Sequence, residues 1–204
     1  TLFDSADVRT PRLLAQGAEV TLVCADRLSP EKGVYELVQA FGRIIEKCGG
    51  ARLHLYGDGP LRNRILDFIT RRSLGDRAFV HGSVPHAELL KRLRDADVLV
   101  NLTKVGDLNR TLWEGAAAGC AIIASDLGGV RSFFEDGKSA LLVRPTDVGE
   151  IASALLRVCS DARFRAFLAR GANELAKSNT NIQTKMRRRD WVMSMLDKKA
   201  SSEA

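Results

Sequence analysis

The sequence lacks any apolar run long enough to span a bilayer, which takes about 20 consecutive apolar residues. Its first residues, TLFDSADVR, lack the basic and apolar regions of a signal peptide. Neither a transmembrane segment nor a signal peptide is therefore expected, and the four cysteines, which lie mostly in apolar segments as reduced thiols do, predict a cytoplasmic location. Because the chain begins with Thr1 rather than Met, we expect it to be a piece of a longer protein.

Cysteine and histidine are scarce, with four and three residues among 204. The cysteines match no metal-ligand spacing and lie mostly in apolar segments, as buried reduced thiols do. No histidine stands in a pattern with a serine or cysteine nucleophile, so triad chemistry is unsupported. We therefore expect no metal and no cofactor, and we interpret His54 and His81 as structural residues on strands.

The phosphate-binding loop of nucleoside triphosphatases and the Gly-x-Gly-x-x-Gly pattern are also absent. The net charge of +6 suits an anionic ligand, an anionic lipid surface or nucleic acid. Much of the positive excess lies in one run near the C-terminus, from Lys185 to Arg189, so no nucleic-acid partner is expected. We interpret this run as a solvated helix face, with peripheral contact with an anionic membrane as the alternative.

What the sequence does have is the composition of an ordinary globular chain, 45% apolar and 27% charged. Short apolar runs alternate with stretches of helical period, which is typical of parallel strands joined by crossover helices. The expected strands are 19–25, 52–56, 78–80, 98–102, 121–124 and 140–143. Their nearly continuous hydrophobicity predicts strands covered on both faces. Further on, the pattern is helical only, over 148–158 and 162–176.

The predicted fold class is α/β: a single doubly wound, Rossmann-like parallel sheet of about six strands with a helical C-terminal extension. Residues 1–17 are predicted to be an incoming connection, 18–178 the ligand-binding α/β domain, and 179–204 a C-terminal helix and tail. In such sheets the ligand binds beyond the carboxyl ends of the strands. The informative residues are therefore those that directly follow each strand.

The first such loop, ADRLSPEKG, carries two cations, Arg27 and Lys32. Ser29 and Pro30 predict the start of a helix, whose free backbone amides would favour a phosphate. Two cations in contact with a diphosphate would each contribute about 4 kcal/mol at an effective dielectric constant near 20, before desolvation. The alternative is a capped, solvated turn with two surface cations.

The loop after the fourth predicted strand leads into a helix from about Asn109 to Ala118, which contains one carboxylate, Glu114, among apolar and small residues. An unpaired buried charge is strongly unfavourable, so Glu114 needs a partner. The hydroxyls of a vicinal diol such as a ribose would supply one, and so would an ion pair with a nearby arginine. The small residues from Gly115 to Gly119 predict close packing of this helix on the sheet.

Glycine-containing loops follow three other strands, at 57–60, 82–85 and 126–129. Glycine permits close approach of the backbone to a ligand, and it equally suits a short turn between a strand and a helix. Both interpretations stay open for these loops.

Together these segments resemble the C-terminal, donor-binding domain of family-four retaining glycosyltransferases of the GT-B fold. The resemblance runs from about residue 20 to residue 177. Its segments are, in order, ADRLSPEKG, LHLYGDGP, FVHGSVPHAEL, DADVLVNL, LWEGAAAGCAIIASDLGG and FFEDGKSALLVRPTD. It implies a nucleotide sugar, carried by UDP or GDP, as the ligand of domain 18–178.

The resemblance also implies residue roles. Arg27 and Lys32 match the basic pair that holds the donor diphosphate and stabilises the charge on the leaving nucleotide. Glu114 matches the second glutamate of a pair separated by seven residues, the one that binds the ribose hydroxyls. The other implied substrate-binding positions are the segment that lines the base, Gly82, Ser83 and Val84, and the loop that meets the phosphates and the sugar, Gly106, Asp107, Leu108, Asn109 and Arg110.

One position departs from the family pattern, because the first glutamate of that pair falls on Gly106. In the family that residue contacts the transferred sugar, and the adjacent Asp107 is the candidate substitute.

A GT-B enzyme also needs an N-terminal acceptor domain, for which 204 residues leave no room. We therefore expect this chain to bind a nucleotide sugar weakly and not to transfer it alone. The parent enzyme would move a hexose-type sugar to a saccharide or lipid-linked acceptor. The alternatives are a GT-B nucleotide-sugar epimerase and a non-catalytic sugar-nucleotide-binding or assembly module.

Overall fold

The structure is a computed structural model that describes residues 19–105 and 109–179. The predicted incoming connection 1–17, the basic run from Lys185 to Arg189 and all but the first residue of the predicted tail lie outside the described residues. Gly106, Asp107 and Leu108 of the predicted phosphate and sugar loop also lie outside them. The fold below is therefore that of the predicted α/β domain.

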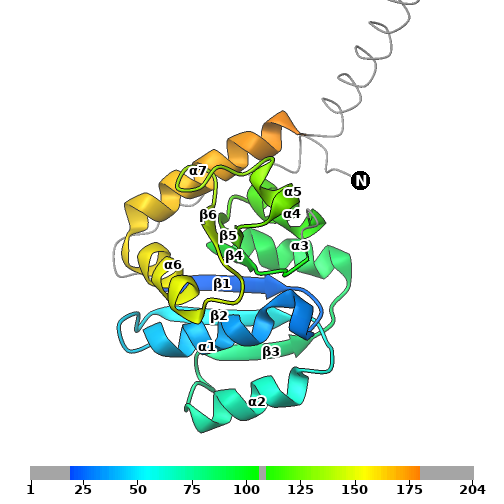
Figure 1. Ribbon diagram of the computed structural model, residues 1–204, viewed down its shortest axis with the longest axis vertical. Coiled ribbons are helices and arrows are strands. Elements are labelled where there is room, and N and C mark those ends of the chain that lie inside the picture. Colours follow the sequence, from blue (N-terminus) through cyan, green and yellow to red (C-terminus); the bar gives the residue numbers. More distant parts are fainter. Residues whose placement is uncertain (1–18, 106–108, 180–204) are drawn as a thin grey trace, which may run out of the picture.

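Within the described residues, six strands form one parallel sheet at the centre of the molecule (Figure 1). They are β1 (Val20–Ala25), β2 (Ala51–Tyr56), β3 (Ala78–Gly82), β4 (Val98–Asn101), β5 (Ala121–Ser125) and β6 (Leu141–Val143). Their order across the sheet is β3-β2-β1-β4-β5-β6. The predicted fold class and all six predicted strands are confirmed, and the predicted strand ends differ by at most two residues.

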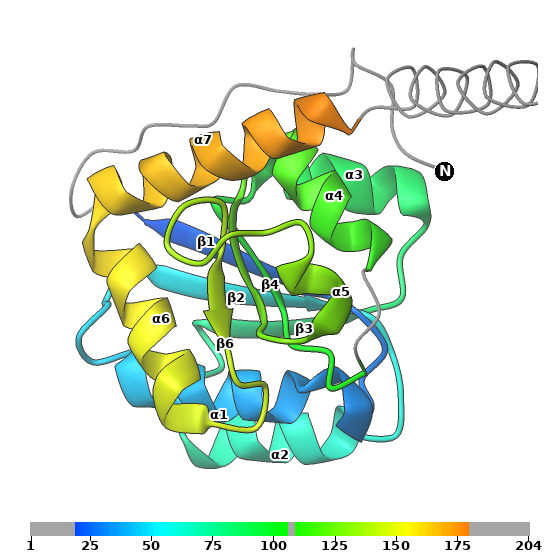
Figure 2. The ribbon, with the colours of Figure 1, turned by 45° about the horizontal axis from the view of Figure 1, so that its top comes forward.

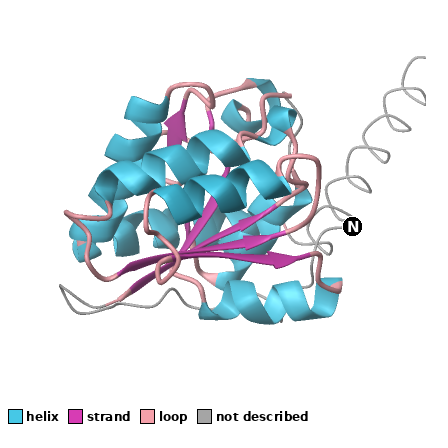
Figure 3. Cartoon of the chain, turned by 90° about the horizontal axis from the view of Figure 1, so that it is seen from below, coloured by secondary structure: helices cyan, strands magenta, loops and turns pink. Residues whose placement is uncertain are grey.

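Helices cover both faces of this sheet (Figures 2 and 3). They are α1 (Val34–Ile44), α2 (Arg62–Arg71), α3 (His86–Asp95), α4 (Arg110–Ala118), α5 (Gly128–Arg131), α6 (Val148–Ser160) and α7 (Ala162–Ser178). Helices α1, α2 and α6 pack on one face, α3 and α4 pack on the other, and α7 lies alongside α4. The two predicted C-terminal helices are α6 and α7.

Alternation along β1 explains why both faces are covered. Leu22 and Cys24 belong to the buried cluster under α1, whereas Val23 and Ala25 belong to the cluster under α3 and α4. The continuous hydrophobicity of the strand therefore reflects two separate cores, one on each side of the sheet.

Helix α4 lies close to the sheet because of Gly115. A Cβ atom at this position would lie 2.4 Å from Leu99 Cδ2 and 3.0 Å from Leu99 Cβ on β4. Gly119 then ends the helix in the left-handed conformation, with a φ of 89°. The predicted close packing of this small-residue segment is confirmed.

The order of the strands reverses between β1 and β4, since β2 and β3 lie on one side of β1 and β4 to β6 on the other. The connections that leave the carboxyl ends of β1 and β4 run in opposite directions, which opens a crevice between them. The loop that carries Lys32 follows β1, and helix α4 follows β4. The fold thus brings these two predicted segments to one edge of the sheet.

Within the described residues, no helix is both long and apolar enough to cross a membrane. The four cysteines are unpaired, and three of them are buried. Burial raises the pKa of the Cys120 thiol to about 12. That thiol therefore stays protonated and unreactive at neutral pH.

Candidate functional site

The loop after β1 holds both predicted cations. Pro30–Lys32 form a single 3-10 turn, and Gly33 follows with a φ of 62°, so α1 begins only after it. The left-handed glycine interrupts the helical backbone at this point. Ser29 and Pro30 do open a helix as predicted, but it is a single 3-10 turn that ends before α1 begins. The Ser29 hydroxyl donates a hydrogen bond to the Glu31 carboxylate and does not cap a backbone amide.

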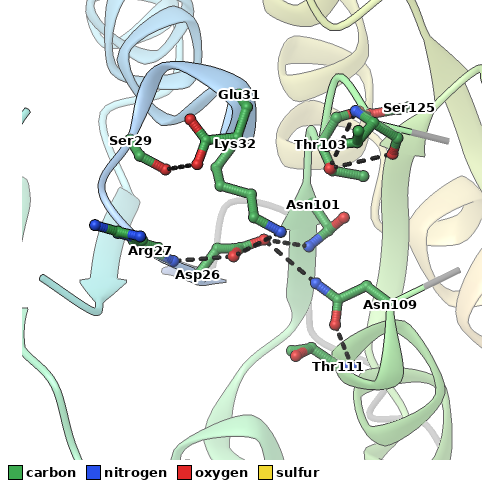
Figure 4. A network of polar contacts seen from close by, with 11 residues as sticks. Asp26, Arg27, Ser29, Glu31, Lys32, Asn101, Thr103, Asn109, Thr111 and Ser125 are labelled. Carbon is green, nitrogen blue, oxygen red and sulfur yellow. Dashed lines mark hydrogen bonds and ion pairs between the residues drawn. The ribbon is translucent and has the colours of Figure 1, made fainter. Parts of the chain in front are cut away.

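Asp26 joins the two sides of the crevice (Figure 4). Its Oδ1 lies 3.2 Å from Lys32 Nζ and accepts a hydrogen bond from the backbone N–H of Arg27. Its Oδ2 accepts hydrogen bonds from the side-chain amides of Asn101, at the end of β4, and Asn109, before α4, at 3.1 and 3.3 Å. The side chain is only 10% exposed, and each oxygen meets two donors. Asp26 thus ties Lys32 to the start of α4.

Arg27 and Lys32 do not lie side by side. Figure 4 shows the Arg27 side chain pointing away from the pair formed by Asp26 and Lys32. Arg27 lines a hollow of about 360 Å³ beyond the ends of β1, β2 and β3, together with the predicted Ser83 and Val84. The other lining residues are Ala25, Asp26, Tyr56, Gly57, Asp58 and Leu89. The structure therefore groups Arg27 with the segment predicted to line a base, and Lys32 with α4.

Gly82 shapes the rim of this hollow. It ends β3 with a φ of 75°, a left-handed conformation that favours glycine. Its carbonyl oxygen accepts a hydrogen bond from the Gly57 N–H at 2.8 Å. The turn interpretation therefore applies at Gly82, and the turn sends the chain along the wall formed by residues 83 and 84.

Helix α4 carries the other half of the site. Asn109 caps its N-terminus, since its Oδ1 accepts a hydrogen bond from the Thr111 N–H at 3.0 Å. Glu114, about one turn further on, is only 7% exposed. Its Oε1 accepts a hydrogen bond from His86 Nε2 at 2.8 Å and lies 2.9 Å from Arg110 Nε. The ion pair that the sequence offers as one partner for Glu114 is thus formed, and His86 of α3 adds to it.

These contacts make a continuous path around the crevice. The segment 83–85 forms part of the wall of the hollow and leads directly to His86, which binds Glu114. Helix α4 leads from Glu114 back to its cap, Asn109, which donates to Asp26. Asp26 lines the hollow where the path began. The predicted site residues within the described part of the chain are therefore linked by contacts at one edge of the sheet, where Arg27, Ser83 and Val84 line the hollow.

Two residues of this path, Asp26 and His86, are absent from the set that the sequence predicts. Asp26 directly follows a buried strand, and a carboxylate at the end of a strand beside the crevice is a usable signal. His86 begins a helix after a proline, and a single histidine at such a place belongs to no recognisable pattern. The sequence could have pointed to Asp26, but it held no comparable signal for His86.

His54 and His81 lie side by side on β2 and β3, as predicted for structural residues. His54 Nδ1 and His81 Nε2 are 2.9 Å apart, and the stacked rings have centroids 5.2 Å apart. Burial lowers the pKa of both rings, and repulsion from His81 lowers that of His54 further. In residues 19–105 and 109–179, no group of three or more His, Cys, Asp or Glu side chains could hold a metal ion.

Comparison with known proteins places this chain in a family. Residues 19–161 match the family described as "Glycosyl transferases group 1". The chain belongs to this family. The glycogen synthase of Mycobacterium tuberculosis is 30% identical over 164 residues, which make up 80% of this chain and 39% of that protein. This member of the family thus spans about two fifths of the length of that curated relative.

Two solved structures share the fold. TarM of Staphylococcus aureus, in a complex that includes UDP, superposes with a TM-score of 0.77 at 19% identity, over 91% of this chain and 37% of that chain. The C-terminal domain of LpcC, a group 1 family protein from Francisella tularensis, superposes with a TM-score of 0.76 at 20% identity, over 86% of this chain and 97% of that domain. The predicted resemblance to a C-terminal glycosyltransferase domain is confirmed.

Proposed function

We propose that this chain is the donor-binding half of a retaining, metal-independent glycosyltransferase. The parent enzyme would transfer a hexose-type sugar from a nucleoside diphosphate to a saccharide or lipid-linked acceptor. The observation that carries the proposal is the path of contacts that links the hollow, Asp26 with Lys32, and Glu114 at the edge where doubly wound sheets bind ligands. Membership of the family supports the class of reaction, and the UDP complex of TarM supports a nucleoside diphosphate as ligand.

Lys32 and Arg27 would hold the diphosphate from two sides. An ammonium group has three N–H donors, and the ion pair with Asp26 engages one of them. Lys32 can therefore donate to phosphate oxygens while it stays beside Asp26. Arg27 lines the hollow, from which its guanidinium can reach the diphosphate of a nucleotide bound there. Both cations would stabilise the negative charge that develops on the leaving nucleotide.

The remaining residues would align the nucleotide. Ser83 and Val84 line the hollow that would accommodate the base. Glu114, buried on α4, would accept hydrogen bonds from the ribose hydroxyls, while Asn109 and Arg110 lie at the end of α4 that faces the phosphates in this proposal. Holding the nucleotide at base, ribose and diphosphate fixes the position of the sugar bond that breaks.

A first experiment measures binding of UDP, GDP, ADP and inorganic pyrophosphate to this chain by isothermal titration calorimetry. We expect one nucleoside diphosphate to bind better than the others. The variants Lys32→Ala and Arg27→Ala should each weaken its binding by about tenfold or more, since each removes a charged contact with the diphosphate. Arg71→Ala is the matched control, because it removes the same charge from a largely exposed pair with Asp67 on α2. Failure of every nucleoside diphosphate to bind, or unchanged affinity in both crevice variants, would overturn the proposal.

The proposal, in which donor and acceptor bind to different domains, leads to a second expectation. The chain should bind a nucleotide sugar without transferring the sugar to a simple saccharide acceptor, because acceptor binding belongs to the other domain in this proposal. Mass spectrometry of the products of a longer parent protein would show whether the sugar is transferred to an acceptor or whether the nucleotide sugar is isomerised. Turnover by this chain alone would contradict the division of labour between the two halves.

A further inference from the structure

Two side chains hold the Glu114 carboxylate at its Oε1 atom. His86 Nε2, from α3, and Arg110 Nε, from the preceding turn of α4, both reach Oε1, at 2.8 and 2.9 Å. The side chains of both residues are about half exposed, at 51% and 57%, whereas that of Glu114 is 7% exposed. The residue as a whole is 7% exposed, so few water molecules can reach the carboxylate. The protein therefore holds this carboxylate through Oε1, and because each carboxylate oxygen can accept about two hydrogen bonds, Oε2 can accept from a ligand.

Of the two contacts to Oε1, that of His86 fixes the orientation. The last torsion of a glutamate side chain is broad and roughly two-fold, so a carboxylate held loosely exchanges its two oxygens by rotation. Arg110 lies on the same helix as Glu114, one turn away, and its long side chain is 57% exposed. His86 reaches across from another helix on a short, rigid ring. A tie between two elements restrains the rotation more strongly than a flexible partner on the same helix does.

The position of His86 also connects Glu114 to the hollow. His86 is the first residue of α3, and it follows directly on the segment that contains Ser83 and Val84, two lining residues of the hollow. The backbone that would contact a base therefore continues without a break into the residue that orients Glu114.

We propose that His86 is a positioning residue for ribose recognition. It holds Oε1 of Glu114 so that Oε2 faces the bound ligand and accepts hydrogen bonds from the vicinal hydroxyls of a nucleoside diphosphate. The site thereby prefers a ribose over a deoxyribose. The inference rests on the proposed function, since it assigns a role within the same nucleotide site.

The experiment compares the dissociation constants of UDP and GDP with those of their 2′-deoxy and 3′-deoxy analogues, with inorganic pyrophosphate as a further probe. For the wild-type chain we expect the ribonucleotide to bind about 10- to 100-fold more tightly than the deoxy analogue, the range for hydrogen bonds to a charged group. His86→Ala should reduce this ratio to less than about threefold, and pyrophosphate binding should stay within about twofold. His86→Gln, which keeps an N–H donor, should restore most of the ratio.

Arg92→Ala is the matched control. Arg92 lies on the same helix, is 52% exposed against 51% for His86, and pairs with Glu88. This variant should leave the ratio unchanged, and melting curves establish that each variant is folded. A folded His86→Ala chain that keeps the wild-type ratio overturns the inference. Equal binding of ribo- and deoxynucleotides by the wild type also overturns it and leaves the donor proposal standing, whereas binding of no nucleoside diphosphate overturns both.

Discussion

Asp26, which is partly buried, and Glu114, which is buried, are carboxylates on opposite sides of the crevice that meet their hydrogen-bond donors differently. Asp26 meets four donors from three segments of the chain, two at each oxygen. Glu114 meets two groups, both at a single oxygen. Burial is nearly the same, with 10% and 7% of the side chains exposed. The placement of these donors therefore distinguishes the two carboxylates, since donors reach both oxygens of Asp26 while His86 and Arg110 meet at Oε1 of Glu114, although charge and burial do not distinguish them.

The difference indicates different roles for the same chemical group. A carboxylate whose acceptor positions are all filled has nothing left to offer a ligand, so Asp26 acts as a bridge that sets the distance between Lys32 and α4. A buried carboxylate that the protein holds at one oxygen can accept a ligand's donor at the other, and each such hydrogen bond to a buried charge is favourable. In the proposed function, Asp26 therefore shapes the site and Glu114 contacts the ligand.

The variant Asp26→Ala should show the largest effect on stability, and it tests whether Asp26 is a structural bridge. It leaves Lys32 without its partner and the buried amide of Asn101 without an acceptor. We expect the free energy of unfolding to fall by about 2–4 kcal/mol, somewhat below the usual range for a fully buried pair because Lys32 is 25% exposed. Urea denaturation measures the loss. Asp67→Ala, which breaks an exposed pair on α2, should change stability by less than about 0.5 kcal/mol, and an equally small loss for Asp26→Ala would refute the bridge.

The variant Glu114→Gln probes the other carboxylate. His86 and Arg110 are about half exposed, so water can solvate them when the charge of Glu114 is removed. We expect the free energy of unfolding to change by less than about 1 kcal/mol in the same urea experiment. If Glu114→Gln destabilised the chain as much as Asp26→Ala, the distinction between a bridging and a ligand-binding carboxylate would not hold.

A pH series measures how another part of the sheet, the stacked His54 and His81 on β2 and β3, contributes to the stability of the fold. The pKa of His54 and of His81 is lowered by burial, so the folded state resists protonation of these rings. Stability should therefore be fully present above the unfolded-state value near pH 6.5 and should decline as the pH falls below it. We expect this loss to be small, because both rings are partly exposed to solvent.

The variant His54→Gln combined with His81→Gln is the control for this series, and thermal melts between pH 7.5 and 5.5 measure the effect. The double variant should show a flatter profile of stability against pH over that range.

The ion pair of Asp126 and Arg131 responds to pH in a different range. Its hydrogen bonds lower the pKa of Asp126, so the stability that this pair contributes is lost only as the pH falls below about 4. The pH range in which protonation of His54 and His81 lowers stability therefore does not overlap the range in which Asp126 is protonated. An unchanged slope in the double variant would refute the assignment of this acid sensitivity to His54 and His81.

Much of the fold could be predicted because strands and helices leave local patterns. The buried strands β1 and β4 are continuous apolar runs, and the packing of α4 follows from glycine at position 115. The 3-10 turn before Gly33 was harder to predict. Ser29 and Pro30 suit the start of a helix equally well, and the left-handed glycine that interrupts the backbone acts three residues later.

The sequence by itself determined which residues leave water, because hydrophobic periodicity reports burial directly, and it therefore predicted a buried carboxylate on α4 that needs a partner. Only the tertiary structure decided the partners. Asp26 and Asn109 lie 83 positions apart in the chain, and His86 and Glu114 lie 28 apart. A hydrogen bond requires a donor and an acceptor about 3 Å apart in space. The crossover connections of the sheet bring these residues to that distance, and the local sequence pattern does not encode it.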